Sequence, residues 1–431
     1  MNRRKFIETT FAGSMATLSI ANGLSAAPFA VDRNKLMPVS QLKKRVAIAM
    51  WDFSWILRHH RYGEFENWDK ALDELAERGY NAIRMDCMPQ FVASDKNGSI
   101  TEEFRSIKDG WLPALWGNDF TMSFRPREAL LEFLPKCRER GIRTGLASWF
   151  LNHNAGRTDI FTEEGGLFRA WDETLTFLDR NGLLDDNILY ADILNEYPCV
   201  NGYEWLKTEL NKRSDVKKFR ENNPEAHLPD PDPDAGKLPD NYLAIEFQKQ
   251  FVNDLLSRLK AKYPAIDFFV SFNPCIGSFD NMDLTRFGAI DRHIWFQCRE
   301  DGFTGMREVE SRMQGKEMDF RVHMKNIRVY FEENKPALTA WMKDQIDEIA
   351  LAAAKHNLVC GNTEGWGPIL WLDHPELSWD WVKESGDICV DLACSHPEYK
   401  FICTSNFTHP HFKGIWEDMK WHRKITGKIK A

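Results

Sequence analysis

Two glutamates in this 431-residue chain stand where runs of apolar residues stop. Glu196 follows Asn195 directly after the run 187–194, and Glu364 comes two residues after the run 358–362. Two carboxyl groups can share the work of a displacement, because one can donate a proton while the other, ionised, attacks as a nucleophile. This chemistry requires both side chains to face one ligand, so the elements that carry them must bring them together.

Short apolar runs that predict strands alternate with longer stretches whose apolar residues recur at helical spacing. The predicted strands are 45–51, 80–86, 142–150, 187–194, 266–272, 289–296, 358–362 and 399–405. The predicted helices are 68–78, 126–140, 167–180, 242–263, 320–356 and 379–394. Eight alternations in about 390 residues predict one α/β domain, a parallel (β/α)8 TIM barrel, with an open doubly wound sheet as the alternative.

In a closed barrel, strands four and seven end at the same mouth, where barrel enzymes build their sites. Glu196 and Glu364 can then flank one bond, which is the arrangement that acid-assisted glycoside cleavage requires. Long connections leave the same mouth after strand two (88–125) and after strand four (199–240). Each could be a lid, a wall of the site or a surface insertion.

The Asn-Glu pair ending strand four and the single glutamate ending strand seven resemble clan A glycoside hydrolases, the cellulase-like, family 5-related retaining enzymes. The resemblance implies cleavage of a β-glycosidic bond with Glu364 as the nucleophile and Glu196 as the general acid/base. It also implies that Asn195 binds the sugar 2-hydroxyl. In these roles Glu196 needs a raised pKa while Glu364 stays charged.

Further positions match that clan. Arg84, near the end of strand two, matches the arginine that orients the nucleophile. His293 and Trp295 match the histidine and the aromatic residue near the end of strand six, although the clan often has tyrosine in place of Trp295. The clan's strand-eight tryptophan has no counterpart in 404–407, so we expect Trp366 or Trp371 to form the floor under the sugar.

Tryptophan is abundant, with 16 residues, and its flat amphipathic ring suits stacking on sugars. Several tryptophans lie at or just beyond the ends of predicted strands. Some of these must pack at the barrel rim, while two or three are expected to contact sugar. The candidates that we assign to the substrate are Trp51, Trp149, Trp295 and Trp366.

Composition and motifs exclude other classes. The formal charge of −8 argues against a general nucleic-acid binder. The chain has neither a GxGxxG after its first strand nor a GxxxxGK[ST], so no nucleotide cofactor is predicted, and no metal is expected at the site. Two other functions stay open: a carbohydrate-binding barrel without catalysis, and a metal-dependent sugar isomerase or epimerase.

The first 30 residues resemble an export signal. Arg3 and Arg4 precede a weakly apolar stretch and the small residues 25–27, which is the order of a twin-arginine signal. We therefore expect a signal at 1–30, one catalytic barrel at 40–431 and a periplasmic or secreted protein. No segment is apolar enough to predict a membrane span. The sequence leaves the oligomeric state and a bridge between Cys389 and Cys394 open.

Overall fold

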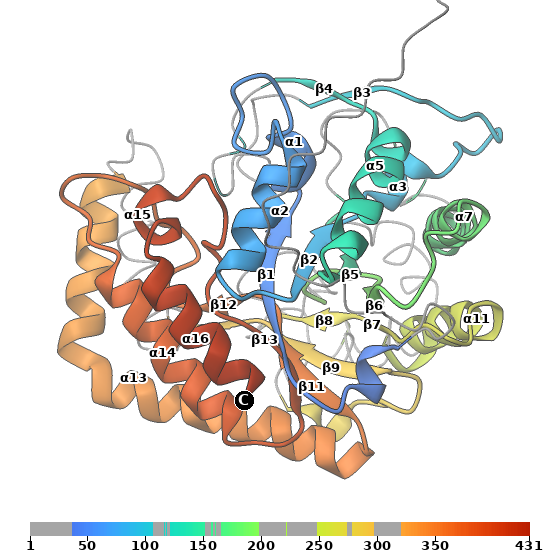
Figure 1. Cartoon of the computed structure of the whole chain (residues 1–431). Helices are drawn as coiled ribbons and strands as arrows, with labels where there is room; N and C mark the ends of the chain where they lie inside the picture. Colours follow the sequence, from blue (N-terminus) through green and yellow to red (C-terminus); the bar gives the residue numbers. More distant parts are fainter. Residues whose placement is uncertain are drawn as a thin grey trace, which may run out of the picture. The chain divides into compact units, whose positions relative to one another are not determined.

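The computed structural model describes residues 37–106, 121–150, 165–197, 248–273, 278–296 and 320–431, together with the single residues 116, 118, 157, 160 and 221. The ribbon is shown in Figure 1. The predicted export signal at 1–30 lies outside the described residues, and so does the predicted long connection at 199–240 apart from residue 221.

Parallel strands form the barrel that the sequence predicted. In chain order they are β1 (Val46–Asp52), β2 (Ala82–Asp86), β5 (Arg143–Ala147), β6 (Ile188–Asp192), β7 (Phe268–Phe269), β8 (Ser271–Phe272), β9 (Ala289–Arg292), β11 (Val359–Asn362) and β13 (Tyr399–Cys403). Their order in the sheet is β7-β6-β5-β2-β1-β13-β11-β9-β8. Val270 alone separates β7 from β8; β7 pairs with β6 and β8 with β9, so this fifth strand closes the ring. The fold is therefore a TIM barrel and not an open doubly wound sheet.

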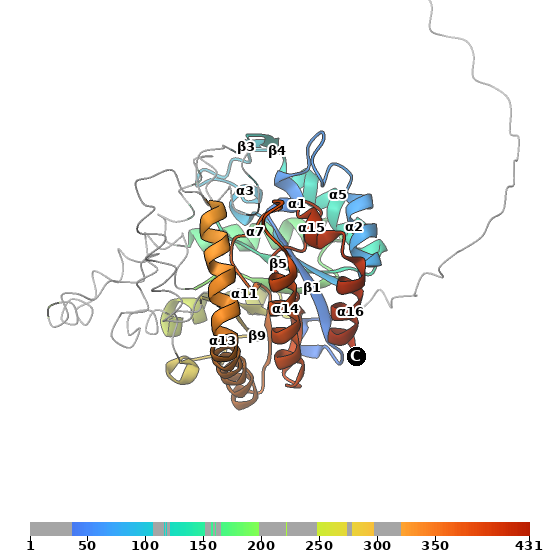
Figure 2. The ribbon, with the colours of Figure 1, turned by 90° about the vertical axis from the view of Figure 1, so that its left-hand side faces the viewer.

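Helices follow the strands and cover the outside of the barrel. The long ones are α2 (Trp68–Glu77), α5 (Pro126–Glu139), α7 (Gly166–Arg180), α11 (Asn253–Lys262), α13 (Phe320–His356), α14 (Asp380–Cys394) and α16 (Met419–Lys430). A π-helical turn, Gln248–Val252, leads into α11. The sequence analysis predicted all of the long helices except α16, which follows the last strand. Figures 1 and 2 show α14 between α13 and α16.

Shorter elements decorate the connections. They are the helices α1 (Ser54–Leu57), α3 (Pro89–Val92) and α15 (Lys413–Trp416), the 3-10 turns η1 (Val39–Gln41) and η7 (Phe279–Asn281), and the paired strands β3 (Phe104–Arg105) with β4 (Ser123–Phe124) and β10 (Ile294–Trp295) with β12 (Gly365–Trp366). The connection predicted after strand two thus contains α3 and the β3–β4 pair. The β10–β12 pair extends strands six and seven beyond the barrel.

Local sequence explains why these helices form where they do. In α2, the side chain of Asn67 caps the helix by accepting from the backbone N–H of Lys70 at 3.0 Å. The apolar residues of α2 recur three and four positions apart and are buried: Trp68, Ala71, Leu72 and Leu75. The chain leaves the helix at Gly79, whose φ of 86° favours glycine.

Aromatic rings fill the barrel beneath the mouth. The ring of Tyr190 lies 4.8 Å from that of Phe269 and 5.6 Å from that of Phe401, measured between centroids. Glycines make room for them: a Cβ on Gly145 would lie 2.1 Å from the Tyr190 ring, and one on Gly361 would lie 2.3 Å from the Phe401 ring. The barrel is therefore a packed core that supports a site only at its end.

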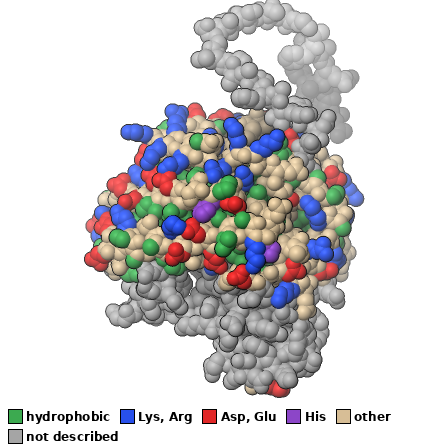
Figure 3. Space-filling view, turned by 90° about the horizontal axis from the view of Figure 1, so that it is seen from below, with side chains coloured by type: hydrophobic (Ala, Val, Ile, Leu, Met, Phe, Trp, Pro, Cys, Tyr) green, Lys and Arg blue, Asp and Glu red, His purple; other side chains and the backbone are tan. Residues whose placement is uncertain are grey.

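Acidic and basic side chains are interspersed on the face seen from below in Figure 3. Within the described part of the chain, no helix is both long and apolar enough to cross a membrane. Cys389 and Cys394 are both free thiols on α14, so they do not form the bridge that the sequence left open.

Candidate active site

Arg84 lies at the centre of the barrel mouth, on β2, and is fully buried. Its Nη1 donates to Asp52 Oδ1 at 2.6 Å and also to Glu364 Oε1. Its Nη2 lies 3.2 Å from Asp192 Oδ2 and donates to Asn195 Oδ1 as well. One arginine therefore joins the ends of strands one, two, four and seven.

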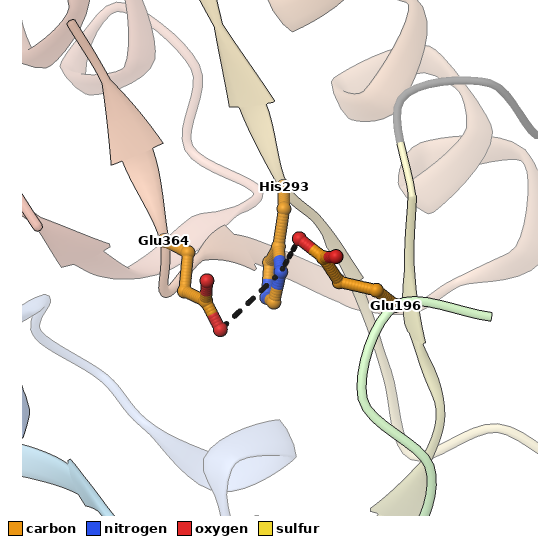
Figure 4. A group of neighbouring side chains, drawn as sticks. All are labelled: Glu196, His293 and Glu364. Atoms are coloured by element: carbon orange, nitrogen blue, oxygen red, sulfur yellow. Dashed lines mark hydrogen bonds and ion pairs between the residues drawn. The ribbon is translucent and has the colours of Figure 1, made fainter. Parts of the chain in front are cut away.

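His293, just beyond β9, lies between the two predicted glutamates (Figure 4). Its Nδ1 lies 3.1 Å from Glu196 Oε1 and 3.5 Å from Glu364 Oε1. Its Nε2 lies 3.2 Å from Thr363 Oγ1 and 3.7 Å from Asp291 Oδ2. The imidazole thus links Glu196 to Glu364, and its other edge is fixed by strands six and seven.

The two glutamates face one another but differ in exposure. Their nearest ligand atoms, together with that of His293, all lie within 4.8 Å of one another. The side chain of Glu364 is 1% exposed and that of Glu196 is 16% exposed. Glu196 has a φ of 56°, and its backbone N–H donates to Ser271 Oγ at 2.9 Å, so the strand end turns its side chain toward His293.

Burial and neighbouring charges shift the pKa values of Glu364 and His293 in opposite directions. Burial raises the pKa of Glu364 well above the ordinary range, while His293 and Arg84 act to lower it. Burial acts to lower the pKa of His293, but the carboxyl groups of Glu364, Asp291 and Glu196 raise it well above its ordinary value. A raised pKa disfavours the charged form of Glu364 that the sequence analysis expected, and its cause is the burial of the side chain.

Two of the predicted sugar-stacking tryptophans have indole groups that are buried and hydrogen-bonded inside the protein. The ring of Trp51 packs 6.2 Å from that of Phe133 of α5, on the helix side of β1, and its Nε1 donates to the Thr408 carbonyl at 2.8 Å. Trp366 donates from Nε1 to the Cys403 carbonyl at 2.9 Å. Both tryptophans are fully buried. These places do not suit stacking on a sugar, so we withdraw Trp51 and Trp366 from the substrate site.

Trp149 and Trp295 lie closer to the charged groups. The Trp295 ring is 5.9 Å from that of His293, and both indole nitrogens are buried without a hydrogen-bond partner among the described residues. Trp371, the other candidate for the sugar floor, packs with its ring 5.1 Å from that of Trp381 and belongs to the core. Trp149 and Trp295 are therefore the tryptophans that we keep at the site.

Sequence reasoning missed the aspartates that complete the site. Asp52, Asp192 and Asp291 were not among the predicted site residues. Asp192 Oδ1 accepts from the Ser271 N–H at 2.8 Å, and Asp291 Oδ2 accepts from Thr363 Oγ1 at 2.6 Å. The available signal was an aspartate inside each apolar strand run, because a carboxylate is rarely buried without a partner.

Among the described residues, Glu196, His293 and Glu364 form the group close enough to hold a metal ion. The arrangement does not favour a cation, since the Arg84 guanidinium already contacts Glu364. The geometry suits an acid pair organised by Arg84 and His293.

The parallel barrel with two glutamates at its mouth agrees with the family comparison. The family described as sugar-binding cellulase-like matches residues 48–430. The chain therefore belongs to this family. A search of curated proteins finds no significant match to the chain.

Solved structures were compared with this one, and the first of those named below shares its fold. A Parabacteroides distasonis ATCC 8503 protein, provisionally named a glycoside hydrolase, superposes with a TM-score of 0.71 at 27% identity over 90% of this chain and 94% of that one. A GH5_18 protein from Streptomyces cattleya, in complex with GlcNAc, has a TM-score of 0.47 at 12% identity, covering 92% of this chain and 80% of that one. An endo-β-1,4-mannanase from Thermotoga petrophila has a TM-score of 0.44 at 10% identity, covering 91% and 78%.

Proposed function

We propose that this protein is a retaining glycoside hydrolase that cleaves a β-glycosidic bond in an oligosaccharide or polysaccharide. The observation that carries the proposal is the opposed pair Glu196 and Glu364, whose nearest oxygens lie within 4.8 Å with His293 between them. Retaining enzymes hold their two carboxyl groups about 5–5.5 Å apart, whereas inverting enzymes leave about 6.5–9.5 Å for a water molecule. The short separation favours retention.

The reaction then takes two displacements. Glu364 attacks the anomeric carbon while Glu196 gives its proton to the leaving oxygen, so the glycosidic bond breaks and a glycosyl-enzyme ester forms. Glu196, now ionised, takes a proton from water. That water attacks the anomeric carbon, and the ester bond to Glu364 breaks, which releases the sugar with its original configuration.

The neighbouring groups suit these roles. Arg84 and His293 place positive charge beside Glu364 and so favour the ionised form that attacks. Glu196 is the more exposed of the pair, which suits exchange of a proton with water. Asn195 Oδ1 accepts from Arg84 Nη2, and the buried Nδ2 of Asn195 has no partner among the described residues. That amide group can donate to the sugar 2-hydroxyl.

The test is hydrolysis of a panel of 4-nitrophenyl β-glycosides and of plant and microbial oligosaccharides. The wild type would be compared with Glu196→Gln and Glu364→Gln. Activity that collapses in both variants, with retention seen by NMR of the first product, supports the proposal. Activity that survives in either variant contradicts the assignment of the two carboxyl groups.

The family description favours a second candidate, a sugar-binding barrel without catalysis. Trp295 stands where the clan often has a tyrosine beside the nucleophile, which also favours this alternative. Calorimetric binding of oligosaccharides without turnover would identify it. The third alternative, a metal-dependent isomerase, rests on the grouping of Glu196, His293 and Glu364, and stoichiometric metal in the purified protein would favour it.

We also propose that residues 1–30 direct the protein out of the cytoplasm. The proposal rests on Arg3 and Arg4 before an apolar stretch and small residues. Fractionation of cells that express the full chain should find it in the periplasm or the medium. The variant with both arginines changed to lysine should stay in the cytoplasm.

A further inference from the structure

The edge of His293 that faces away from the two glutamates is held by Thr363 and Asp291. All three side chains are fully buried. Thr363 Oγ1 donates to Asp291 Oδ2 at 2.6 Å, and the Thr363 backbone N–H donates to Asp291 Oδ1 at 3.1 Å. His293 Nε2 lies 3.2 Å from the same Thr363 Oγ1. The two displacements described above use neither Thr363 nor Asp291.

The Thr363 hydroxyl hydrogen decides which nitrogen of His293 carries a proton. A hydroxyl group has one hydrogen, and Thr363 gives it to Asp291, so only lone pairs of Oγ1 face His293. Nε2 is therefore the donor in its contact with Thr363. A neutral imidazole has only one N–H group, so neutral His293 carries its hydrogen on Nε2 and has a lone pair on Nδ1.

The Nδ1 atom of His293 faces both glutamates, at 3.1 Å from Glu196 Oε1 and 3.5 Å from Glu364 Oε1. An ionised carboxyl group can only accept a hydrogen bond, and the same holds for Nδ1 of neutral His293. Contact between the two would bring lone pairs together beside a fully buried imidazole, which is unfavourable. A proton between Nδ1 and Glu196 removes this conflict.

The charges around His293 also favour a proton at this place. Among the described residues, three carboxyl groups face the imidazole: Glu196 after β6, Asp291 of β9 and Glu364 after β11. Arg84 of β2 contacts Glu364 in turn, and Asp52 of β1 contacts Arg84. The three nearest groups are acidic, so they oppose the loss of a proton from His293.

We propose that Asp291 and Thr363 are positioning residues that hold His293 with Nε2 protonated, so that Nδ1 shares one proton with Glu196. The proton lies on Nδ1 beside an ionised Glu196, or on Glu196 beside a neutral imidazole, and no other bond changes between the two states. The second state is the acid of the first displacement. After this proton has gone to the leaving oxygen, the facing lone pairs favour its replacement from water. The inference rests on the proposed function for the role of Glu196.

Two variants should weaken this arrangement, and one should keep it. Thr363→Val removes the hydroxyl group, so neutral His293 can carry its hydrogen on Nδ1 and donate it to an ionised Glu196; the shared proton is then lost at lower pH. Asp291→Asn should act in the same direction, because the new amide oxygen accepts from the Thr363 N–H. The amide NH2 then donates to Oγ1, and the hydroxyl hydrogen turns toward Nε2. Thr363→Ser keeps the hydroxyl group.

The experiment measures kcat/KM against pH on a 4-nitrophenyl β-glycoside that the wild type cleaves. The basic limb of that profile reports the loss of the acid's proton in the free enzyme. We expect its midpoint to fall by about one to two pH units in Thr363→Val and in Asp291→Asn, which corresponds to one hydrogen bond to a charged group. Thr363→Ser should have the midpoint of the wild type.

Thr174→Val is the control for a purely structural effect. It removes another fully buried hydroxyl group, which lies in α7 and donates to the Ala170 carbonyl at 2.7 Å. Its midpoint should equal that of the wild type. An unchanged midpoint in Thr363→Val overturns the proposal, and so does an equal shift in Thr363→Ser or in Thr174→Val.

A second measurement depends neither on catalysis nor on the folding of a Thr363 variant. Imidazole nitrogen NMR shifts of isotope-labelled wild type distinguish a nitrogen that carries hydrogen from one with a lone pair. The signals of His293 are those that His293→Gln lacks. When His293 becomes neutral as the pH rises, we expect its hydrogen on Nε2; a hydrogen on Nδ1 overturns the inference. If the wild type cleaves no glycoside, the proposed function fails, while this measurement still decides the inference.

Discussion

The two sides of the candidate site differ in the kind of positive charge that organises them. On one side Arg84, which stays charged at all relevant pH values, binds Asp52, Asp192 and Glu364 in a fully buried network. On the other side His293, whose pKa the surrounding carboxyl groups raise well above its ordinary value, contacts Glu196, whose side chain is partly exposed, as well as Glu364. The first side fixes the position of Glu364, and the second leaves Glu196 open to water.

This difference suggests how two glutamates at one barrel mouth can have different chemical roles. A nucleophile benefits from a fixed position and from a permanent cation that opposes the effect of burial on its pKa. An acid/base must change its protonation state twice per turnover, which requires access to water. The following predictions test whether the two sides are as different as their contacts indicate.

The largest effect is expected from Glu196→Gln on a substrate with a poor leaving group, such as a methyl glycoside. General acid catalysis contributes about 10²- to 10⁴-fold, so kcat/KM should fall by that factor. A 2,4-dinitrophenyl glycoside needs no proton on its leaving group, and its first displacement should be nearly unaffected. Stopped-flow measurement should therefore show a burst of dinitrophenol before slow turnover. Equal losses on both substrates would remove the distinction between the two glutamates.

Arg84→Met should destabilise the fold strongly. It leaves the buried carboxyl groups of Asp52, Asp192 and Glu364 without their cation, and breaking a buried ion pair from one side costs about 3–5 kcal/mol. Urea unfolding measures the loss. Arg84→Lys keeps the charge but has no planar guanidinium group to bridge the same carboxyl groups. Its stability should therefore lie between that of Arg84→Met and that of the wild type. A Met variant as stable as the wild type would show that the network does not need its cation.

Asp86 shows what happens to a buried carboxyl group at the same mouth without a cation in contact. Burial raises the pKa of Asp86 to about 7, although the backbone N–H groups of Trp149 and Met88 act to lower it. The folded protein then keeps a proton on Asp86 between about pH 4 and pH 7 that the unfolded chain has released. The free energy of unfolding should therefore fall as the pH rises through this window.

Asp86→Asn removes the titrating group. The decrease in the free energy of unfolding with rising pH should therefore be smaller in this variant than in the wild type, by roughly 2 to 4 kcal/mol. The measurement is the midpoint of urea unfolding of the wild type and the variant from pH 4.5 to 8. Their difference isolates Asp86, because the other acidic groups titrate in both proteins. Parallel curves would show that the pKa of Asp86 is near its ordinary value in the folded protein.

The smallest effect is expected from Trp366→Phe. The change removes the hydrogen bond to the Cys403 carbonyl and should cost about 0.5–1.5 kcal/mol of stability. KM should stay the same, since the Trp366 indole is fully buried and its N–H is already bonded to the Cys403 carbonyl. Trp149→Phe should instead change KM or Kd for sugars. A raised KM in Trp366→Phe would restore this tryptophan to the substrate site.

The fold could be predicted well from the sequence because each strand and helix of the barrel has its own local pattern of apolar residues. Every described strand of the barrel appears as a short apolar run, since a parallel strand in a barrel is covered on both faces. The long helix Phe320–His356 has the bounds that its pattern predicted. The last helix, Met419–Lys430, was missed, although its buried positions Trp421, Ile425 and Ile429 also recur four apart.

The amino-acid sequence by itself determined the eight alternations of strand and helix and placed Glu196 and Glu364 at strand ends. It could do so because the spacing of apolar residues and the residues that end each apolar run are local properties of the chain. Only the tertiary structure decided which side chains enter the mouth. Asp52 has a φ of 31° beside a register shift in β1, so it joins Arg84 while Trp51 next to it turns to the helices. Such directions depend on backbone torsion at a strand end and on pairing with distant strands, and no local pattern records them.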